Sequence, residues 1–214
     1  MKYRLAIFDM DGTILDTLED LADATNYTLK ACGYPARTLE EIRWFVGNGI
    51  RKLIERALPE GAPDAEIDRL FGVFIPYYQE HCAVKTGPYA GINELIKTLR
   101  SRGIATAVVS NKAEAAVGEL CETYFDGLFD AYAGDRPDMR RKPAPDSVNL
   151  ILHKLGFDRA DAVYIGDSDV DLATAKNASL PCIGCAWGFR GREFLENNGA
   201  TMIADTPSDI LRFF

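Results

Sequence analysis

Short apolar runs alternate with longer helix-like stretches along most of the chain, and this alternation constrains the fold more than any other feature. The apolar runs predict buried strands at residues 4–8, 104–109, 131–133, 162–165, 181–183 and 202–204. Between the later runs the sequence predicts helices at residues 91–102, 113–124, 146–155 and 169–177. Strands that alternate with helices in this way predict an α/β fold, in which helices cover both faces of a parallel sheet.

A long helical stretch interrupts the alternation between the first strand and the second. It shows no convincing strand and instead contains amphipathic segments at residues 18–30, 40–44, 50–58 and 65–81, separated by turns rich in glycine and proline. The sequence therefore predicts a helical domain, residues 17–85, inserted into a core formed by residues 1–16 and 86–214.

The composition favours a globular protein with a sizeable core, since 47% of the 214 residues are hydrophobic. The 32 acidic residues outnumber the 24 Lys and Arg, which gives a formal net charge of −8 and no basic stripe of the kind that binds nucleic acid. No segment approaches the roughly 20 apolar residues that cross a bilayer, and the first apolar run is too short for a secretory signal. We therefore expect a cytoplasmic protein with no nucleic-acid or membrane partner.

Five scattered cysteines, an odd number, favour free thiols in a reducing compartment. Cys182 and Cys185 form a Cys-x-x-Cys pair, which is compatible with a redox pair or with half of a zinc site. No second pair or nearby His completes a zinc site, and the apolar residues around the pair favour a buried strand instead.

Two carboxylates, Asp9 and Asp11, directly follow the first predicted strand. Side chains two residues apart at a strand end can face the same crevice, and Gly12 allows a sharp turn there. One carboxylate can then attack an electrophile while the other transfers a proton. The same letters also occur in calcium loops, but the residues after Thr13 are apolar where such a loop needs further ligands.

Polar residues follow two later strands as well. Ser110 and Asn111 stand where a strand meets a helix, which is typical of a helix N-cap and also suits a phosphate oxyanion. Lys142 precedes two prolines that fix the backbone, so its ammonium group can act as a fixed positive charge.

The last patch is acidic and begins after the strand at residues 162–165. Asp167, Asp169 and Asp171 alternate along the chain and would repel one another without a cation or a lysine. Their oxygen atoms suit Mg²⁺, with Asp167 as the best candidate ligand. Asp171 faces the same way and can hold either a metal-bound water or Lys142.

Taken in order, these four patches resemble the signature motifs of the haloacid dehalogenase superfamily, and the resemblance covers essentially the whole chain. It implies a Rossmann-like core with an α-helical cap domain, which corresponds to the insertion at residues 17–85. It also implies a Mg²⁺-dependent hydrolase of small phosphorylated metabolites that works through an aspartyl-phosphate. Asp11 favours phosphatase over dehalogenase chemistry, because true dehalogenases lack an acid at that position.

The resemblance assigns a role to each motif residue. Asp9 resembles the nucleophile, Asp11 the acid and base, Lys142 the charge neutraliser and Asp171 the supporting acid. Ser110 and Asn111 match the phosphate-binding pair, and Thr13 is a further substrate-binding candidate. The metal ligands implied are Asp167, a carboxylate oxygen of Asp9 and the backbone carbonyl of Asp11.

Two further stretches, residues 46–50 and 187–191, are similar to phosphoglycolate phosphatases and their close relatives. Arg43, Asn48 and Arg51 are the candidates in the helical stretch for reading an anionic leaving group. The alternatives left open are a β-phosphoglucomutase-like mutase and an inorganic pyrophosphatase of the same fold. A non-enzymatic phospho-receiver module is disfavoured, because it has no helical insertion and its phosphorylated acid follows the third strand.

Overall fold

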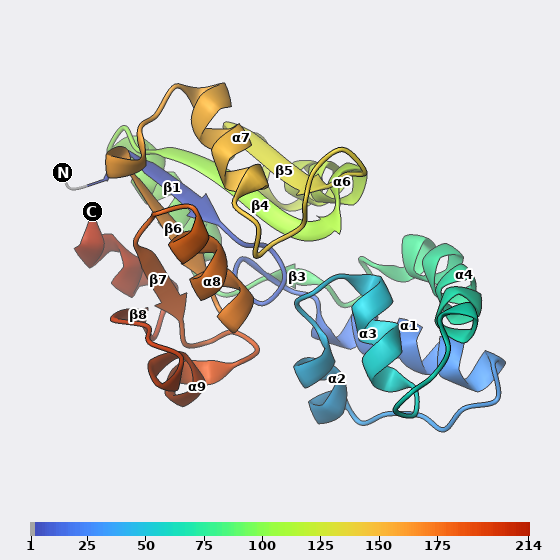
Figure 1. The fold of residues 1–214 in the computed structure, drawn as a ribbon. Helices are drawn as coiled ribbons and strands as arrows, with labels where there is room; N and C mark the ends of the chain where they lie inside the picture. Colours follow the sequence, from blue (N-terminus) through green and yellow to red (C-terminus); the bar gives the residue numbers. More distant parts are fainter. Residues whose placement is uncertain (1–2) are drawn as a thin grey trace. The chain divides into compact units, whose positions relative to one another are not determined.

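A sheet of six parallel strands organises the larger part of the computed structural model, which describes residues 3–214 (Figure 1). The strands are β1 (Leu5–Phe8), β4 (Ala105–Ala113), β5 (Ala131–Asp135), β6 (Ala162–Gly166), β7 (Cys182–Cys185) and β8 (Met202–Ala204). They lie in the order β5-β4-β1-β6-β7-β8, and every neighbouring pair is parallel. This is the strand order of a Rossmann-like sheet, which confirms the predicted fold class.

Helices cover both faces of this sheet (Figure 1). They are α5 (Ile92–Ser101), α6 (Glu114–Phe125), α7 (Asp146–Leu155), α8 (Asp169–Asn177) and α9 (Gly191–Asn197), with 3-10 turns η1 (Arg159–Asp161) and η2 (Pro207–Phe213). In β1, Ala6 and Phe8 belong to the core cluster that includes α5 and α6, whereas Leu5 and Ile7 belong to the cluster that includes α7 and α8. Successive side chains of a strand point to opposite faces, so this short apolar run fills both layers of the core.

The structure corrects one boundary of functional interest. Ser110 and Asn111 lie inside β4, which runs to Ala113, and α6 begins only at Glu114. They are therefore strand residues and not the helix N-cap that the sequence pattern allowed. The strand continues because β4 pairs with β5 up to Asp135, with a register shift between Val109 and Ala113.

A second unit, Asp16–Gly87, is helical and separate from the unit formed by the chain up to Leu15 together with Pro88–Phe214. Its helices are α1 (Leu18–Ala31), α2 (Leu39–Phe45), α3 (Ile50–Ala57) and α4 (Asp64–His81). Two short strands, β2 (Leu15–Asp16) and β3 (Gly87–Pro88), pair where the chain leaves the sheet unit and returns to it. Buried Asp20 of α1 accepts hydrogen bonds from the backbone N–H groups of Lys85 and Thr86, at 3.0 and 2.8 Å.

All five cysteines are free thiols, as predicted. Cys182 packs with the core cluster of α7 and α8, and Cys185 with the cluster on the other face of the sheet. Because the sheet separates the two thiols, the Cys-x-x-Cys pair belongs to the core packing of β7 and cannot enclose a zinc ion.

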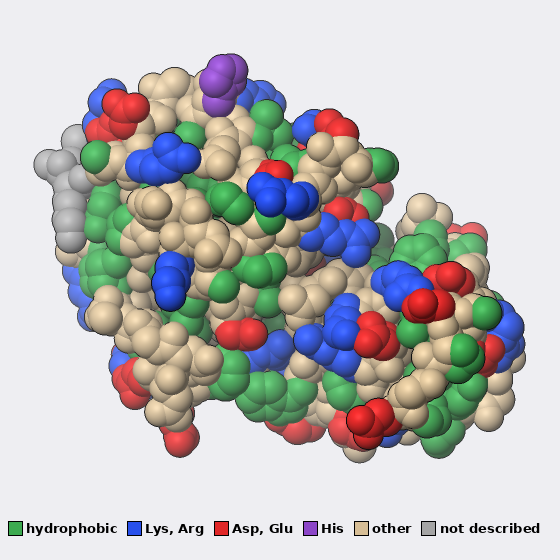
Figure 2. All heavy atoms as spheres, viewed as in Figure 1, with side chains coloured by type: hydrophobic (Ala, Val, Ile, Leu, Met, Phe, Trp, Pro, Cys, Tyr) green, Lys and Arg blue, Asp and Glu red, His purple; other side chains and the backbone are tan. Residues whose placement is uncertain are grey.

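The surface carries both signs of charge. In Figure 2, Lys and Arg side chains lie next to Asp and Glu side chains across the face in view. Among residues 3–214, no helix combines the length and the apolar character that crossing a membrane requires.

Candidate active site

Two carboxylates, Asp9 and Asp167, follow the ends of the neighbouring strands β1 and β6. Phe8 pairs with Ile165 in this ladder, and the backbone N–H of Asp9 donates to the carbonyl of Ile165 at 2.8 Å. After β1 the chain continues to β4 and β5 on one side of it in the sheet, whereas after β6 it continues to β7 and β8 on the other side. The connections therefore diverge at the ends of β1 and β6, which leaves a crevice between them. The topology therefore brings together two motifs that lie far apart in the sequence.

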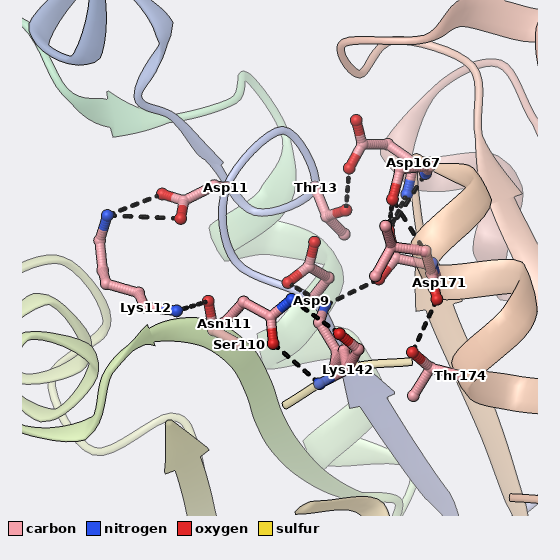
Figure 3. Close-up of polar contacts among 12 residues, drawn as sticks. Asp9, Asp11, Thr13, Ser110, Asn111, Lys112, Lys142, Asp167, Asp171 and Thr174 are labelled. Carbon is pink, nitrogen blue, oxygen red and sulfur yellow. Dashed lines mark hydrogen bonds and ion pairs between the residues drawn. The ribbon is translucent and has the colours of Figure 1, made fainter. Parts of the chain in front are cut away.

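Lys142 lies at the centre of this group, as Figure 3 shows. Its Nζ is 2.7 Å from Asp9 Oδ1 and 2.8 Å from Asp171 Oδ1, and it donates to the hydroxyl of Tyr164 at 3.1 Å. The Lys142 side chain is only 3% exposed. One buried ammonium group thus partly neutralises two buried carboxylates, and the catalytic role assigned to Lys142 stays a prediction.

The Asn111 side chain binds the backbone of Lys142 at both its N–H and its carbonyl group. Its Oδ1 accepts from the Lys142 N–H at 2.9 Å, and its Nδ2 donates to the Lys142 carbonyl at 3.2 Å. The sequence pattern suggested a phosphate contact for Asn111 and gave no sign of this second task. The assigned phosphate-binding role of Ser110 and Asn111 stays a prediction.

Asp171 is fixed through both of its carboxylate oxygens. Oδ1 accepts from Lys142 and from the Tyr164 hydroxyl, the latter at 3.2 Å. Oδ2 accepts from the N–H groups of Asp167 and Ser168 and from the Ser168 hydroxyl, at 3.2, 3.1 and 2.6 Å. Ser168 and Asp171 form the capping box that begins α8. Asp171 therefore holds Lys142 and the turn around Asp167.

Asp167 is held by the turn after β1 and by the loop after β7. Its Oδ1 accepts from the Thr13 hydroxyl at 3.0 Å, and its Oδ2 accepts from the Phe189 N–H at 2.7 Å. Thr13 is fully buried. The hydroxyl of this predicted substrate-binding residue thus orients the candidate metal ligand.

The loop after β7 contacts the turn after β1 and Asp167, and the sequence, in which residues 187–191 stand out only as a resemblance, did not predict this contact. The Trp187 indole N–H donates to the carbonyl of Thr13 at 3.0 Å. A Cβ atom on Gly188 would overlap the Asp167 side chain and the carbonyl oxygen of Gly12. The Trp-Gly pair was visible as a subfamily resemblance, but nothing in the sequence linked it to Asp167, because the contact depends on how β7 lies beside β6.

Lys112 is the second missed residue. Its Nζ lies 3.1 and 3.3 Å from the two carboxylate oxygens of Asp11, and its side chain is 6% exposed. The only available signal was a lysine directly after Ser110 and Asn111, which usually indicates a solvated position.

Burial raises the pKa of Asp9 well above its ordinary value, and the charges of Asp171 and Asp167 raise it further while Lys142 opposes them. Burial also raises the pKa of Asp167 to about 7, with a contribution from Asp171 and opposition from its hydrogen bonds to Phe189 and Thr13. For Lys142, burial favours the neutral amine, but Asp171 and Asp9 outweigh it and raise the pKa of this lysine well above its ordinary value. The site holds more negative charge than one lysine offsets.

Carboxylate oxygens of Asp9, Asp167 and Asp171 lie within 4.8 Å of one another, the one such group among the described residues. Each carboxylate oxygen of Asp171 accepts from two or more protein donors, whereas each oxygen of Asp167 has one described donor, so Asp9 and Asp167 are the better candidates to hold a cation. Buried oxygen donors with excess negative charge fit a hard divalent ion. The donor set agrees with the predicted metal site and leaves the identity of the metal open.

The candidates in the helical unit contact other residues of that unit. Arg51 donates to Asp64 and Asp68 at 2.8 and 3.2 Å. Asn48 Oδ1 accepts from Arg56 at 2.9 Å. Arg43 Nε lies 3.6 Å from a carboxylate oxygen of Glu40. Whether Arg43, Asn48 and Arg51 read a substrate stays a prediction.

The chain is similar to known proteins over nearly its whole length. Residues 6–185 match the haloacid dehalogenase-like hydrolase family. A phosphoglycolate phosphatase of Agrobacterium fabrum strain C58 is 34% identical over 94% of this chain and 88% of its own length. One from Pseudomonas putida KT2440 is 31% identical over 97% of this chain and 76% of its own length.

A solved structure agrees with these relatives. It is a Lactobacillus delbrueckii subsp. bulgaricus protein provisionally named as a phosphoglycolate phosphatase, with 43% identity and a TM-score of 0.95. The alignment covers 98% of this chain and 97% of that one.

Proposed function

This chain belongs to the haloacid dehalogenase-like hydrolase family, and we propose that it is a Mg²⁺-dependent phosphatase in which Asp9 is the nucleophile. The observation that carries the proposal is the pairing of Asp9 Oδ1 with Lys142 at 2.7 Å, beside the second buried carboxylate, Asp167. A carboxylate beside a fixed cation can approach a phosphate dianion without the full charge repulsion.

In the first step, an Asp9 carboxylate oxygen attacks phosphorus and forms a P–O bond. The ester P–O bond breaks, its electron pair goes to the leaving oxygen, and Asp11 gives that oxygen a proton. Lys142 offsets charge on the phosphoryl oxygens, and Ser110 orients them. The products of this step are the free alcohol and an aspartyl-phosphate on Asp9.

In the second step, water attacks the same phosphorus and gives a proton to Asp11. The bond between phosphorus and the Asp9 oxygen breaks, and inorganic phosphate leaves. Asp9 returns to the carboxylate and Asp11 to its protonated form, so the cycle closes without any other reactant.

The carboxylates of Asp9 and Asp167 would hold the Mg²⁺, together with the backbone carbonyl of Asp11 that the family resemblance assigns. The bound ion supplies charge neutralisation for the phosphoryl group. Thr13 and the Phe189 N–H keep Asp167 oriented for that task.

We also propose a small phosphorylated metabolite as substrate, with phosphoglycolate as the first candidate, because relatives that align over most of their length carry that name. Residues 17–85 would serve as the cap domain that selects it, with Arg43 and Asn48 among the contacts. Five free thiols support a reducing compartment such as the cytoplasm.

The test is release of phosphate from p-nitrophenyl phosphate by the wild type, by Asp9→Asn and by Asp158→Asn, an exposed aspartate on the same unit. We expect release to require Mg²⁺, to fall to background in Asp9→Asn and to be unchanged in Asp158→Asn. Metal-independent release or an active Asp9→Asn would contradict the mechanism.

A panel of phosphoglycolate, pyrophosphate and sugar phosphates then tests the substrate. Phosphoglycolate should exceed the generic ester in kcat/KM. Isomerisation of a sugar phosphate with little phosphate release would instead indicate a mutase.

A further inference from the structure

Lys112 is a buried lysine to which neither the sequence motifs nor the proposed mechanism assigns a task. It lies near the end of β4, and its Nζ contacts both carboxylate oxygens of Asp11 at 3.1 and 3.3 Å. We propose that Lys112 is a positioning residue for Asp11, the proton-transfer group of the proposed function on which this inference rests.

The geometry separates two lysine–aspartate systems within one site. Figure 3 shows the Asp11 carboxylate pointing toward Lys112, whereas Asp9 points toward Lys142. Lys142 has Asp9, Asp171 and Tyr164 as partners. The nucleophile and the proton-transfer group therefore have separate cations, and each lysine can set the orientation of its own carboxylate.

Burial makes this contact a fixed one. The Lys112 side chain is 6% exposed and that of Asp11 is 19% exposed, so the contact is largely protected from the water that weakens surface ion pairs. The backbone N–H of Lys112 also donates to the Ser110 hydroxyl at 3.2 Å. This bond links Lys112 to the strand segment that carries the proposed phosphate contacts.

Asp11 needs such an anchor because it serves two steps. It gives a proton to the leaving oxygen and then takes one from water, so its carboxylate must stay within reach of both positions. A fixed ammonium group beside it also offsets the negative charge that Asp11 carries between these two transfers.

The proposal predicts a dependence on the leaving group. Ethyl phosphate releases a strongly basic alkoxide oxygen, which needs the proton from Asp11. p-Nitrophenyl phosphate releases a stabilised phenolate, which leaves without a proton from Asp11. Neither leaving group has a charged substituent that Lys112 could bind directly. Loss of Asp11 positioning should therefore slow the first substrate far more than the second.

The experiment compares Lys112→Met with Asp11→Asn on both esters in saturating Mg²⁺, with exposed Lys154→Met as the control. The readout is kcat/KM, which reports phosphoryl transfer to Asp9 and not the later hydrolysis of the aspartyl-phosphate that both esters share. For Lys112→Met we expect kcat/KM on ethyl phosphate to fall about 10- to 100-fold, part of the full contribution of a proton-transfer group, and kcat/KM on p-nitrophenyl phosphate to fall less than about 3-fold. Asp11→Asn should show the same dependence with a larger loss, and Lys154→Met none. Equal losses on both esters in Lys112→Met would overturn the proposal.

A second comparison works even where Lys112→Met alone folds poorly. In the double variant, Asn replaces Asp11, so the loss of Lys112 does not leave a buried carboxylate without its cation. Adding Lys112→Met to Asp11→Asn should cause no further loss on ethyl phosphate, since Lys112 acts through Asp11. A further loss of about 10-fold or more would mean that Lys112 contacts the substrate directly, and it would overturn the positioning role. Failure of the underlying function has a different signature, namely activity in Asp9→Asn.

Discussion

The charged cluster of the candidate active site, in the sheet unit, and the cluster around Arg51, in the helical unit, are held in opposite ways. In the sheet unit, Asp9, Lys142, Asp167 and Asp171 are all buried, and each has hydrogen bonds or ion pairs to other protein groups. In the helical unit, Arg51 pairs with Asp64 and Asp68, whose side chains are 85% and 65% exposed. The first group is held where water cannot replace a lost partner, whereas water can replace the partners in the second.

This difference indicates that the reactive groups are concentrated at the ends of β1 and β6. Buried charges remain stable only when partners lie at fixed places, and the ends of β1 and β6 provide those places. Exposed pairs contribute little to stability, so their loss should cost little.

The largest expected effect is on stability in the sheet unit. Lys142→Met removes the shared cation and leaves Asp9 and Asp171 buried without it, which should lower the free energy of unfolding by about 3–5 kcal/mol. Arg51→Met, in the helical unit, should leave it nearly unchanged. Urea denaturation followed by circular dichroism in metal-free buffer measures both. Similar losses in the two variants would remove the contrast between the units.

The second prediction concerns pH. Burial raises the pKa of Asp167 to about 7, so between about pH 4 and pH 7 the unfolded chain has released a proton that the folded protein retains. The free energy of unfolding of the metal-free protein should therefore fall as pH rises through this window, on the order of 4 kcal/mol in total. The gain in Tm on adding Mg²⁺ should correspondingly be larger at pH 8 than at pH 5.

Asp167→Asn is the matched control for this pH effect. It removes the titrating carboxyl, so its stability should vary less between pH 5 and pH 8, and added Mg²⁺ should raise its Tm less. Parallel curves for the wild type and Asp167→Asn would show that other groups cause the dependence.

A third prediction tests the loop after β7. Gly188→Ala places a Cβ against Asp167 and the carbonyl of Gly12, which should turn the carboxylate away from the metal position. We expect Mg²⁺ affinity, measured by isothermal titration calorimetry, to fall about 10- to 100-fold, as for other residues that orient metal ligands. Gly199→Ala is a control for a glycine with open space around it, although its positive φ of 87° will itself lower stability. Unchanged Mg²⁺ affinity in Gly188→Ala would show that the loop does not set the position of Asp167.

The sequence predicted what depends on local pattern and on strand ends. The six strands, the parallel sheet and the meeting of Asp9, Lys142, Asp167 and Asp171 followed from apolar runs and from the polar residues after them. All of these residues lie directly after strands or at a fixed turn, where topology alone brings them together.

What could not be predicted depends on contacts across the sheet edge. Trp187 donates to the turn after β1, and Phe189 donates to Asp167. Lys112 pairs with Asp11. Each of these contacts joins two segments that are far apart in the chain, and nothing in either segment's sequence indicates the other. The amide of Asn111 was available for a phosphate or for the Lys142 backbone, and only the folded geometry reveals the second contact. Local pattern identifies the reacting groups, whereas the residues that orient them emerge from packing.

The smallest expected effect lies in the helical unit and concerns Asn48. This side chain is held by Arg56, whose guanidinium also donates to the carbonyl of Phe45 at 2.7 Å. If Asn48 reads the leaving group, Asn48→Ala should remove one hydrogen bond, about 1 kcal/mol or roughly a fivefold rise in KM for phosphoglycolate. Because the lost contact is outside the reacting centre, kcat on p-nitrophenyl phosphate should stay unchanged, and Lys30→Met, at an exposed position of the same unit, serves as the control. A parallel loss on both substrates would mean that Asn48 supports the fold of its loop and does not select the substrate.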